Sequence, residues 1–457
     1  MATIYPCFEK FFNGDNLLIF SYGVTNSGKT YTMQGTGTNP GLIPRTLDFL
    51  FDSLKDNLEK KKSIYAFKPD KFNEICSLSE AELNKELEYK EQLLRLSNYK
   101  ELERVDSLSS LVDIADSSCS LENSKKFGGS LDSLSKIANS DSFSSGLCNF
   151  TKSELTSNIR IPSNKKYAIW ISFYELYNDA VYDLLTIPNK NVRTTILNER
   201  PQLKIREDSN RIPYVEGLIQ IPVFNTNEAI KVLKYGEKNL QKSCNSINST
   251  SSRSHAVFCM KIVSKETSSI DGGASMVSIN QLSFCDLAGI ERLSKTNAVG
   301  KVQKEATNIN NSLLALSRCI NQMIANQKLK SNTGQIPYRD NKLTRLFQAY
   351  FEGRSMVKMI VNLNPALPFF DESVNVLKFA AIANQVGFNF YFFYNCLKLL
   401  NAFYLKIQIG LNDEDKIQYR IEAETPSKNR LTVGWEMGMI LNNRKISTKL
   451  FHITYLT

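Results

Sequence analysis

Eight consecutive residues near the start of the chain have the types and spacing of a phosphate-binding loop. Residues Gly23 to Thr30 read GVTNSGKT, which fits the pattern G-x-x-x-x-G-K-[ST]. The glycines of such a loop let backbone N–H groups curl around phosphate oxygens. Lys29 is expected to neutralise the β- and γ-phosphates, and Thr30 to place its hydroxyl on Mg²⁺. The alternative is a Gly-rich turn, but the apolar run Leu17 to Phe20 before the loop and the helical pattern after it favour a phosphate site.

Two later segments have the residue types that would complete such a site. Residues Asn248 to His255 concentrate hydroxyl groups and one guanidinium in a loop before a strand. Taken alone, this segment is better explained as a polar loop. Residues Asp286 to Gly289 directly follow a buried strand, as an acid on the Mg²⁺ side and a glycine that senses the γ-phosphate would. Taken alone, the pattern D-x-x-G is common and weak.

The elements that must position these residues are strands alternating with helices. Apolar runs predict buried strands at Ala168 to Phe173, at Gln281 to Cys285 and at Lys358 to Asn362. Helical periodicity fills the gaps, most clearly from Glu305 to Ile324. Strands and helices that alternate around a phosphate loop indicate an α/β fold with a central, mainly parallel sheet and helices on both faces.

Composition narrows the class of protein without choosing a partner. The chain has 457 residues, 42% of them apolar, and a net charge of +10 with a pI near 9.0. The charge suggests an acidic partner, which could be nucleic acid, an anionic membrane or an acidic protein surface. The nine cysteines are scattered singly and only two histidines occur, so a structural zinc site is not expected. The N-terminus lacks the pattern of a signal peptide, and we expect an intracellular protein.

Two regions differ in texture from the rest of the chain. Residues 57–165 form a polar insertion whose charge-rich first half is compatible with a helix. Its second half has fourteen serines between Ser107 and Ser145, and we expect it to be mostly disordered because it has little apolar surface to bury. Residues 387–457 form an unassigned tail. Its aromatic run from Phe388 to Ile409 is too often interrupted by Asn and Lys for a membrane span.

The phosphate loop and the two later segments, in this order, resemble the kinesin motor domain over residues 1–386, a P-loop NTPase fold. The matching segments also include Gly41–Arg45, Phe173–Asn178, Pro213–Leu218, Asn308–Leu313, Pro337–Gln348 and Met359–Pro365. The amino-acid sequence of the phosphate loop and the long insertion after Arg45 are similar to those of the mitotic kinesin-like class, in particular to the branch of mitotic kinesin-like protein 2. The resemblance implies a site for ATP and Mg²⁺. The residues it assigns to the nucleotide are Gly23, Val24, Thr25, Asn26, Ser27, Gly28, Lys29, Thr30 and Tyr31.

The resemblance also implies metal-binding and catalytic roles. Ser252 would join Thr30 around Mg²⁺, Asp286 would hold the metal through water, and the N–H of Gly289 would report the γ-phosphate. Arg253 and Glu291 would form a gate that closes on ATP, and closure would place Ser251 and Glu291 to order the attacking water. The alternative for Arg253 and Glu291 is an ordinary ion pair.

The resemblance gives the basic charge an acidic partner, tubulin. Arg339, Lys342 and Arg345 recur every three residues in a predicted helix from Tyr338 to Arg345, so we expect them on one helical face. Three lysines in the loop after the D-x-x-G segment are also assigned to microtubule binding. They are Lys295, Lys301 and Lys304. The alternative is a solvated basic face; no groove-reading motif supports nucleic acid.

Several features depart from the family pattern. About twenty residues precede Gly23, and no Arg-x-Arg-Pro segment is present to flank the adenine. We therefore expect the first strand or strands to be missing and an interior strand to be left unpaired. Ile290, the pair Lys301-Val302 and Ser317 stand where the family usually has other residues. No neck linker or coiled coil is recognisable after residue 386.

These inferences predict an ATP-dependent microtubule motor of the cytoplasm, acting on spindle microtubules at the midzone and in cytokinesis. The full-length protein is expected to form a homodimer, and neither nucleic-acid binding nor membrane insertion is expected. The alternative is a non-motor microtubule-binding protein with an incomplete ATP site.

Overall fold

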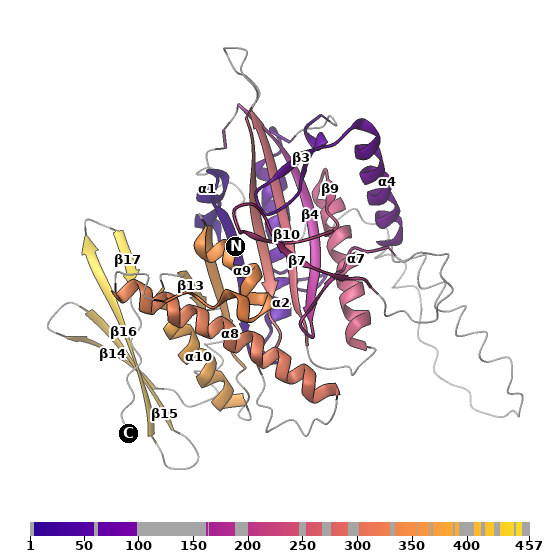
Figure 1. Ribbon diagram of the computed structural model, residues 1–457. Helices are drawn as coiled ribbons and strands as arrows, with labels where there is room; N and C mark the ends of the chain where they lie inside the picture. The colour runs from indigo at the N-terminus through magenta and orange to yellow at the C-terminus, as the bar shows by residue number, and fades with distance from the viewer. Residues whose placement is uncertain are drawn as a thin grey trace, which may run out of the picture.

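A nine-stranded mixed sheet forms the centre of the protein in the computed structural model (Figure 1). Its strands follow the order β13-β12-β1-β11-β10-β4-β5-β6, and β9 pairs with β4 beside this path. The strands are β1 (Asn16–Gly23), β4 (Lys165–Tyr177), β5 (Ala180–Asp183), β6 (Gln202–Leu203), β9 (Ile221–Val223), β10 (His255–Glu266), β11 (Val277–Asp286), β12 (Ser355–Asn362) and β13 (Asn389–Phe392).

The structure describes only part of the chain, and every statement below concerns that part. The described residues are 4–58, 63–97, 161–162, 164–187, 200–245, 253–266, 276–290, 301–329, 334–353, 355–364, 366, 369–386, 389–392, 406–412, 416–424, 430–442 and 445–449. The serine-rich second half of the insertion lies outside these residues, as do Ser251, Ser252, Glu291 and Lys295.

The expectation of a mainly parallel sheet is wrong. Strands β13, β12, β1 and β11 run parallel to one another, but the pairs β11–β10, β10–β4, β4–β5 and β5–β6 are antiparallel. An apolar run shows that both faces of a strand are covered and does not show its direction. Antiparallel neighbours also need no helical crossover, since Asn178 and Asp179 alone connect β4 to β5.

Helices cover both faces of the sheet. One face carries α1 (Tyr5–Phe12), α3 (Leu42–Ser53) and α7 (Thr226–Asn245), and the other carries α8 (Lys301–Leu329), α9 (Lys342–Glu352) and α10 (Phe370–Asn384) (Figure 1). All eight residues of β1 are buried between these layers. Leu17 and Ile19 pack into the first layer and Leu18 and Phe20 into the second, as the two-residue period of a strand requires. This placement fixes the end of β1, where the phosphate loop begins.

Strand β12 is paired along both edges. It runs parallel to β1 over its whole length, and Lys358–Val361 pair in parallel with the short strand β13 after α10. The expectation of an unpaired interior strand is therefore wrong, because residues assigned to no element in the sequence fill that edge. The remaining strands of the tail form a separate antiparallel sheet, in the order β14-β15-β16-β17. They are β14 (Lys406–Asn412), β15 (Lys416–Glu424), β16 (Arg430–Asn442) and β17 (Lys445–Lys449).

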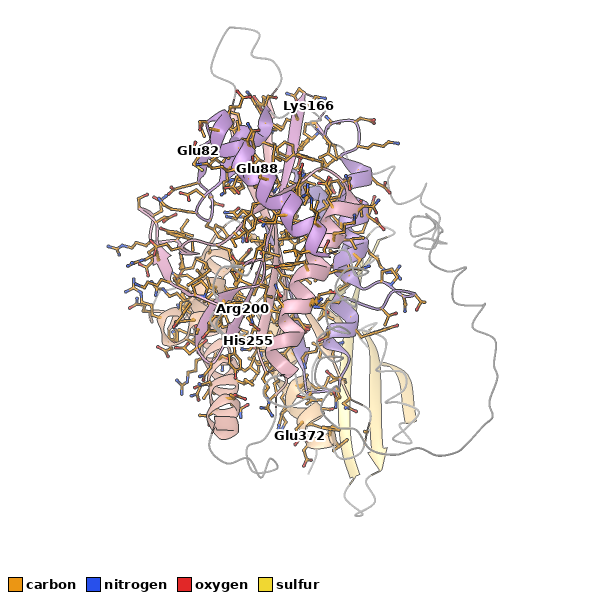
Figure 2. All side chains as sticks on the ribbon, turned by 90° about the vertical axis from the view of Figure 1, so that its right-hand side faces the viewer. Glu82, Glu88, Lys166, Arg200, His255 and Glu372 are labelled. Carbon is orange, nitrogen blue, oxygen red and sulfur yellow. The ribbon has the colours of Figure 1, made fainter. Side chains whose placement is uncertain are left out.

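The first half of the insertion is folded. It contains η1 (Ile64–Ala66), the hairpin of β2 (Phe67–Pro69) and β3 (Ile75–Ser77), and the predicted helix, α4 (Glu80–Ser97). Ser79 and Glu82 begin α4 as a capping box, in which Ser79 N donates to Glu82 Oε2 at 2.8 Å and Glu82 N to Ser79 Oγ at 3.3 Å. Figure 2 shows Glu82 and Glu88 of α4 at one end of the molecule and Glu372 of α10 at the other.

Polar contacts attach the insertion to the sheet layers. The buried Lys90 of α4 donates to Glu228 of α7 at 3.1 Å and lies 3.5 Å from the ring centroid of Phe224. The β2–β3 turn reaches the opposite face, where Phe72 packs edge-on against Tyr350. This half of the insertion is therefore part of the core. None of the helices in the described part of the chain is long and apolar enough to span a bilayer.

Candidate functional site

The phosphate loop curves between β1 and the short helix α2 (Lys29–Met33). Gly28 has a φ of 86°, a left-handed conformation that glycine adopts without steric cost. Gly23 lies so close to the carbonyl of Asn362 on β12 that a Cβ would collide with it. Asn364 holds the loop from the same side, since its Nδ2 donates to Asn26 O at 3.3 Å. The backbone conformation at Gly28 and the close approach at Gly23 therefore explain why both positions of the motif are glycine.

Lys29 is buried, with 5% of its surface exposed, and it turns back over the loop. Its Nζ donates to Gly23 O at 3.0 Å and to Val24 O at 2.8 Å. Thr25 Oγ1 and Ser27 Oγ are buried without a hydrogen-bond partner among the described residues. A buried ammonium beside two unsatisfied hydroxyls fits an anionic ligand, because such groups need a partner when they are removed from water. The predicted phosphate site thus fits its ligand chemically.

Asp286 lies beside the loop because the parallel strands β1 and β11 end together, with Ser21 paired to Asp286. Its carboxylate accepts hydrogen bonds from Thr30 Oγ1 at 2.5 Å and from Ser21 Oγ at 2.7 Å. Burial raises the pKa of Asp286, and the bonds from the two hydroxyls and the charge of Lys29 oppose this rise. A threonine hydroxyl next to a carboxylate is a donor set that suits Mg²⁺. The structure therefore brings together two of the three predicted metal-site residues, and the third, Ser252, is not described.

Gly289 packs directly against the phosphate loop. A Cβ at this position would collide with the side chain and backbone of Thr25. The next residue, Ile290, forms a parallel bridge with Val24, and its N–H donates to Gly23 O at 3.4 Å. The turn after Asp286 thus lies where a phosphate sensor would be required, although its sensing role remains a prediction.

Arg253 has a described acidic partner that the sequence did not suggest. Its Nη1 lies 2.8 Å from Glu305 Oε2 near the start of α8, and Tyr177 OH donates to Glu305 Oε1 at 2.6 Å. The gate predicted between Arg253 and Glu291 lies outside the described residues because Glu291 is not described. The observed pair connects the loop before β10 to α8.

His255 connects the turn after Asp286 to the middle of α8. Its Nδ1 accepts from Ala288 N at 3.1 Å, so its Nε2 carries the proton that faces Ser312 Oγ at 2.8 Å. Ser312 Oγ in turn donates to Ile309 O at 2.6 Å. Burial and, secondarily, the charge of Lys29 lower the pKa of His255 to about 3, so the ring is neutral. Hydrogen bonds therefore run without a break from the backbone of Ala288, in the turn after Asp286, to α8.

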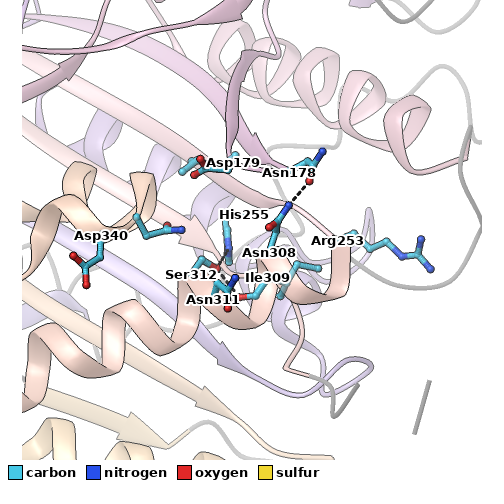
Figure 3. Close-up of a pocket in the computed structure, with 11 residues that line it drawn as sticks. Asn178, Asp179, Arg253, His255, Asn308, Ile309, Asn311, Ser312 and Asp340 are labelled. Atoms are coloured by element: carbon cyan, nitrogen blue, oxygen red, sulfur yellow. Dashed lines mark hydrogen bonds between the residues drawn. The ribbon is translucent and has the colours of Figure 1, made fainter. Parts of the chain in front are cut away.

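A polar cavity of about 220 Å³ lies beside His255, between the end of β4, α8 and the segment before α9 (Figure 3). Asn308 of α8 donates to Asn178 in the β4–β5 turn across it. Asn178 and Asp179 have φ values of 50° and 56°, as the two central residues of a tight hairpin require. This turn therefore meets α8 at a defined position.

The three predicted basic residues do not share one helix. Arg339 lies in the 3₁₀ turn η5 (Tyr338–Asp340), whereas Lys342 and Arg345 lie in α9. Asn341 separates the elements, with extended φ and ψ of −148° and 150°, and caps α9 by accepting from Leu343 N at 2.9 Å. The prediction of a continuous helix is wrong because three-residue spacing fits a helix equally well when a cap interrupts it.

The placement predicted for two lysines is also wrong. Lys301 and Lys304 were expected in a connecting loop, but both lie in the first turns of α8. Lys295 is not described. The helix begins earlier than the apolar pattern showed, because its first turn has a single apolar residue, Val302, and so shows no periodicity.

Residues that the sequence did not assign complete the site. Ser21 donates to Asp286, Asn364 supports the phosphate loop, Glu305 holds Arg253, and Glu207 of β7 (Ile205–Glu207) contacts Arg339 and Arg345. Only Ser21 had a usable signal, a hydroxyl directly after the apolar run Leu17 to Phe20 and two residues before the first loop glycine.

The chain is similar to known proteins over most of its length. A family model described as the kinesin motor domain matches residues 1–386. Kinesin-like protein KIF20A of Bos taurus is 38% identical over 385 residues, which cover 84% of this chain and 41% of that protein. Kinesin-like protein KIF20B of Homo sapiens is 35% identical, covering 82% of this chain and 18% of that protein. Kinesin-like protein KIF23 of Mus musculus is 32% identical, covering 83% and 36%.

Solved structures show the same likeness. A structure titled "kinesin 6" matches with a TM-score of 0.54 and 28% identity, covering 83% of this chain and 85% of that chain. A structure of KIF14 with ADP in complex with a microtubule matches with a TM-score of 0.54 and 24% identity, covering 84% and 76%, which shows a shared fold. The chain spans about two fifths or less of the length of the three curated relatives above.

Proposed function

Since the chain belongs to the kinesin motor-domain family, we propose that it is an ATP-driven microtubule motor. In this proposal ATP hydrolysis at the phosphate loop is coupled to movement along microtubules. The single observation that carries the ATPase part is the contact between Thr30 and Asp286, at 2.5 Å, over a loop that also holds Lys29. It joins the phosphate loop to the strand whose following turn must respond to the nucleotide.

The residues of the loop have separable tasks in this proposal. Lys29 exchanges its bonds to Gly23 O and Val24 O for the β- and γ-phosphates of ATP. Thr30 and Asp286 would hold Mg²⁺, Asp286 through water. When bound, the metal neutralises charge that develops on the phosphates. Thr25 and Ser27 offer their unsatisfied hydroxyls to the same anion. Tyr31, 49% exposed at the edge of the loop, is available to the nucleotide base.

Coupling to the microtubule runs through α8 in this proposal. Gly289 lies against the loop, so its N–H reports a γ-phosphate, and His255 links the neighbouring Ala288 to Ser312 of α8. A shift of the turn on nucleotide binding is therefore transmitted to the helix. We retain Ser251, Ser252 and Glu291 as the residues that complete the metal site and order the attacking water.

Tubulin is the acidic partner proposed for the basic surface. Arg339 is exposed, Arg345 is partly exposed, and both are joined to the β7 strand beside α9. Lys342, Lys301, Lys304 and Lys295 remain assigned to the same partner. The resemblance to the mitotic kinesin-like class supports a place on spindle microtubules, at the midzone and in cytokinesis, with a homodimer as the assembly of the full-length protein.

Microtubule-stimulated ATPase activity tests this function directly. The chain is expected to hydrolyse ATP faster when microtubules are added, and Lys29→Ala is expected to abolish the increase. Lys85→Ala on α4 is the matched control, because it removes one ammonium from an exposed site outside the phosphate loop. If wild-type protein that binds nucleotide shows no stimulation at any microtubule concentration, the motor function is refuted.

A further inference from the structure

One carboxylate contacts both arginines of the proposed tubulin-binding surface. Glu207, at the end of β7, lies with its two oxygens 3.2 and 3.1 Å from Nη2 of Arg339. Its Oε1 also lies 3.0 Å from Nη2 of Arg345. We call Arg339 and Arg345 the arginine pair. Glu207 of β7 lies 132 positions from Arg339 of η5 and 138 positions from Arg345 of α9, so the contact joins distant parts of the chain.

The backbone around Glu207 is fixed by its own hairpin. Strand β7 pairs with β8 (Pro213–Val215), and Asp208 Oδ1 accepts the N–H groups of Asn210 and Ile212, both at 2.8 Å, in the turn between them. Glu207 has 21% of its side chain exposed, compared with 30% for Arg345 and 69% for Arg339. The carboxylate is thus the least exposed member of the cluster, and both guanidinium groups contact it.

Neighbouring charges are committed to other partners. Arg206 faces Glu216 at 3.1 Å, and Asp340 faces Arg318 at 3.9 Å. Within the described part of the chain, Glu207 is the one carboxylate seen in contact with both members of the arginine pair. Two guanidinium groups around one carboxylate keep a net positive charge, so the cluster still attracts an acidic surface while its geometry is defined.

We infer that Glu207 is a positioning residue for tubulin binding. It holds Arg339 and Arg345 in the arrangement in which they meet acidic side chains of the microtubule. The inference rests on the proposed function. Long side chains lose rotamer freedom when they bind, and a residue that orders them beforehand lowers this cost. Arginine also suits such an arrangement, because its planar fork can contact one carboxylate through some N–H groups and leave others for a second.

Simple electrostatics predicts the opposite effect of mutating Glu207. Glu207→Gln raises the net charge from +10 to +11, which by itself strengthens attraction to an acidic partner. Loss of the ordered arginine pair weakens binding instead. The sign of the change in affinity therefore distinguishes a positioning residue from a carboxylate that merely adds negative charge.

The test is co-sedimentation of the chain with microtubules at low salt in a non-hydrolysable ATP analogue. Glu207→Gln is expected to raise Kd about threefold, the size expected for surface ion pairs. Glu207→Asp is expected to restore part of the loss. Glu216→Gln is the matched control. It removes the same charge next to β8, where Glu216 contacts Arg206 and not the arginine pair. The Kd of this variant should equal that of wild type or be lower. A Kd for Glu207→Gln that is unchanged or lower overturns the inference.

A double-mutant cycle separates positioning from a direct contact between Glu207 and tubulin. In a chain that also carries Arg339→Ala and Arg345→Ala, Glu207→Gln is expected to change Kd by less than about 1.5-fold, since nothing remains to be positioned. A full threefold effect in that background assigns Glu207 to a direct contact and overturns the inference. Equal thermal midpoints of the variants exclude unfolding as the cause. If wild-type chain does not bind microtubules, the proposed function fails, which is a separate result.

Discussion

The phosphate loop is held by buried groups, whereas the arginine pair is held by one carboxylate at the surface. Lys29 and Asp286 are 5% and 8% exposed. Lys29 donates to two backbone carbonyls at the start of the loop, and Asp286 accepts from hydroxyls on β1 and α2. Arg339 is 69% exposed, and its described partner is Glu207. The first arrangement forms whenever β1 and β11 pair, while the second depends on ion pairs that water and salt can replace.

This difference implies different sensitivities. Changes at the phosphate loop alter buried groups and should affect catalysis strongly. Changes at the arginine pair act through exposed charges and should give small effects that depend on ionic strength.

Removal of the buried ammonium should have the largest effect. Lys29→Ala is expected to lower the ATPase rate at least about 100-fold, as loss of a preorganised charge at a transferring phosphoryl group does. Steady-state hydrolysis with microtubules measures it, and retained thermal stability shows that the loop still folds. A loss below tenfold would show that the loop is not the centre of the chemistry and would remove the contrast with the arginine pair.

A methyl group at Gly289 should have the next largest effect. The added Cβ of Gly289→Ala collides with Thr25, so the turn must move away from the phosphate loop. We expect microtubule-stimulated turnover to fall roughly tenfold to hundredfold, because small displacements of a catalytic element are costly. Gly37→Ala is the control, since its Cβ meets open space. Equal turnover for the two alanine variants would contradict tight packing at this turn.

The features that the sequence predicted are local, and the features that it missed depend on contacts between distant segments. The phosphate loop, β1, α4 and the core of α8 depend on local patterns, and the family matches confirm the kinesin motor fold and the resemblance to the mitotic kinesin-like class. The direction of β10 and β4, the pairing of β12 with β13, and the partners Glu305 and Glu207 depend on contacts between distant segments. No local pattern contains that information. The break at Asn341 was missed because a helical period persists across a cap.

Protonation of the buried His255 should change the pH dependence of the free energy of unfolding, unlike changes at the exposed arginine pair. The ring has a pKa of about 3 in the folded protein, compared with an ordinary value near 6.5. As pH falls below 6.5 the unfolded chain takes up a proton that the folded chain does not. The free energy of unfolding therefore decreases, by up to about 1.4 kcal/mol per pH unit from this group.

Urea unfolding at several pH values, compared between wild type and His255→Asn, measures this contribution. The difference is needed because Asp183, whose pKa burial raises to about 7, acts in the opposite direction. The folded chain protonates Asp183 first, so that group adds to the free energy of unfolding as pH falls. Parallel pH profiles for wild type and His255→Asn would show that His255 does not stay neutral.

The arginine pair should show the smallest effects, and they should depend on salt. Arg339→Ala and Arg345→Ala are each expected to weaken microtubule binding about threefold at low ionic strength, with the difference from wild type shrinking as salt is raised. Arg345→Ala should retain more of its effect at high salt, because Arg345 is less exposed than Arg339 and its charge is less screened. Lys85→Ala, at the α4 end of the molecule, removes the same charge and should leave binding unchanged. If all three variants weaken binding equally, net charge rather than a defined surface attracts the microtubule, and the arginine pair has no special place in it.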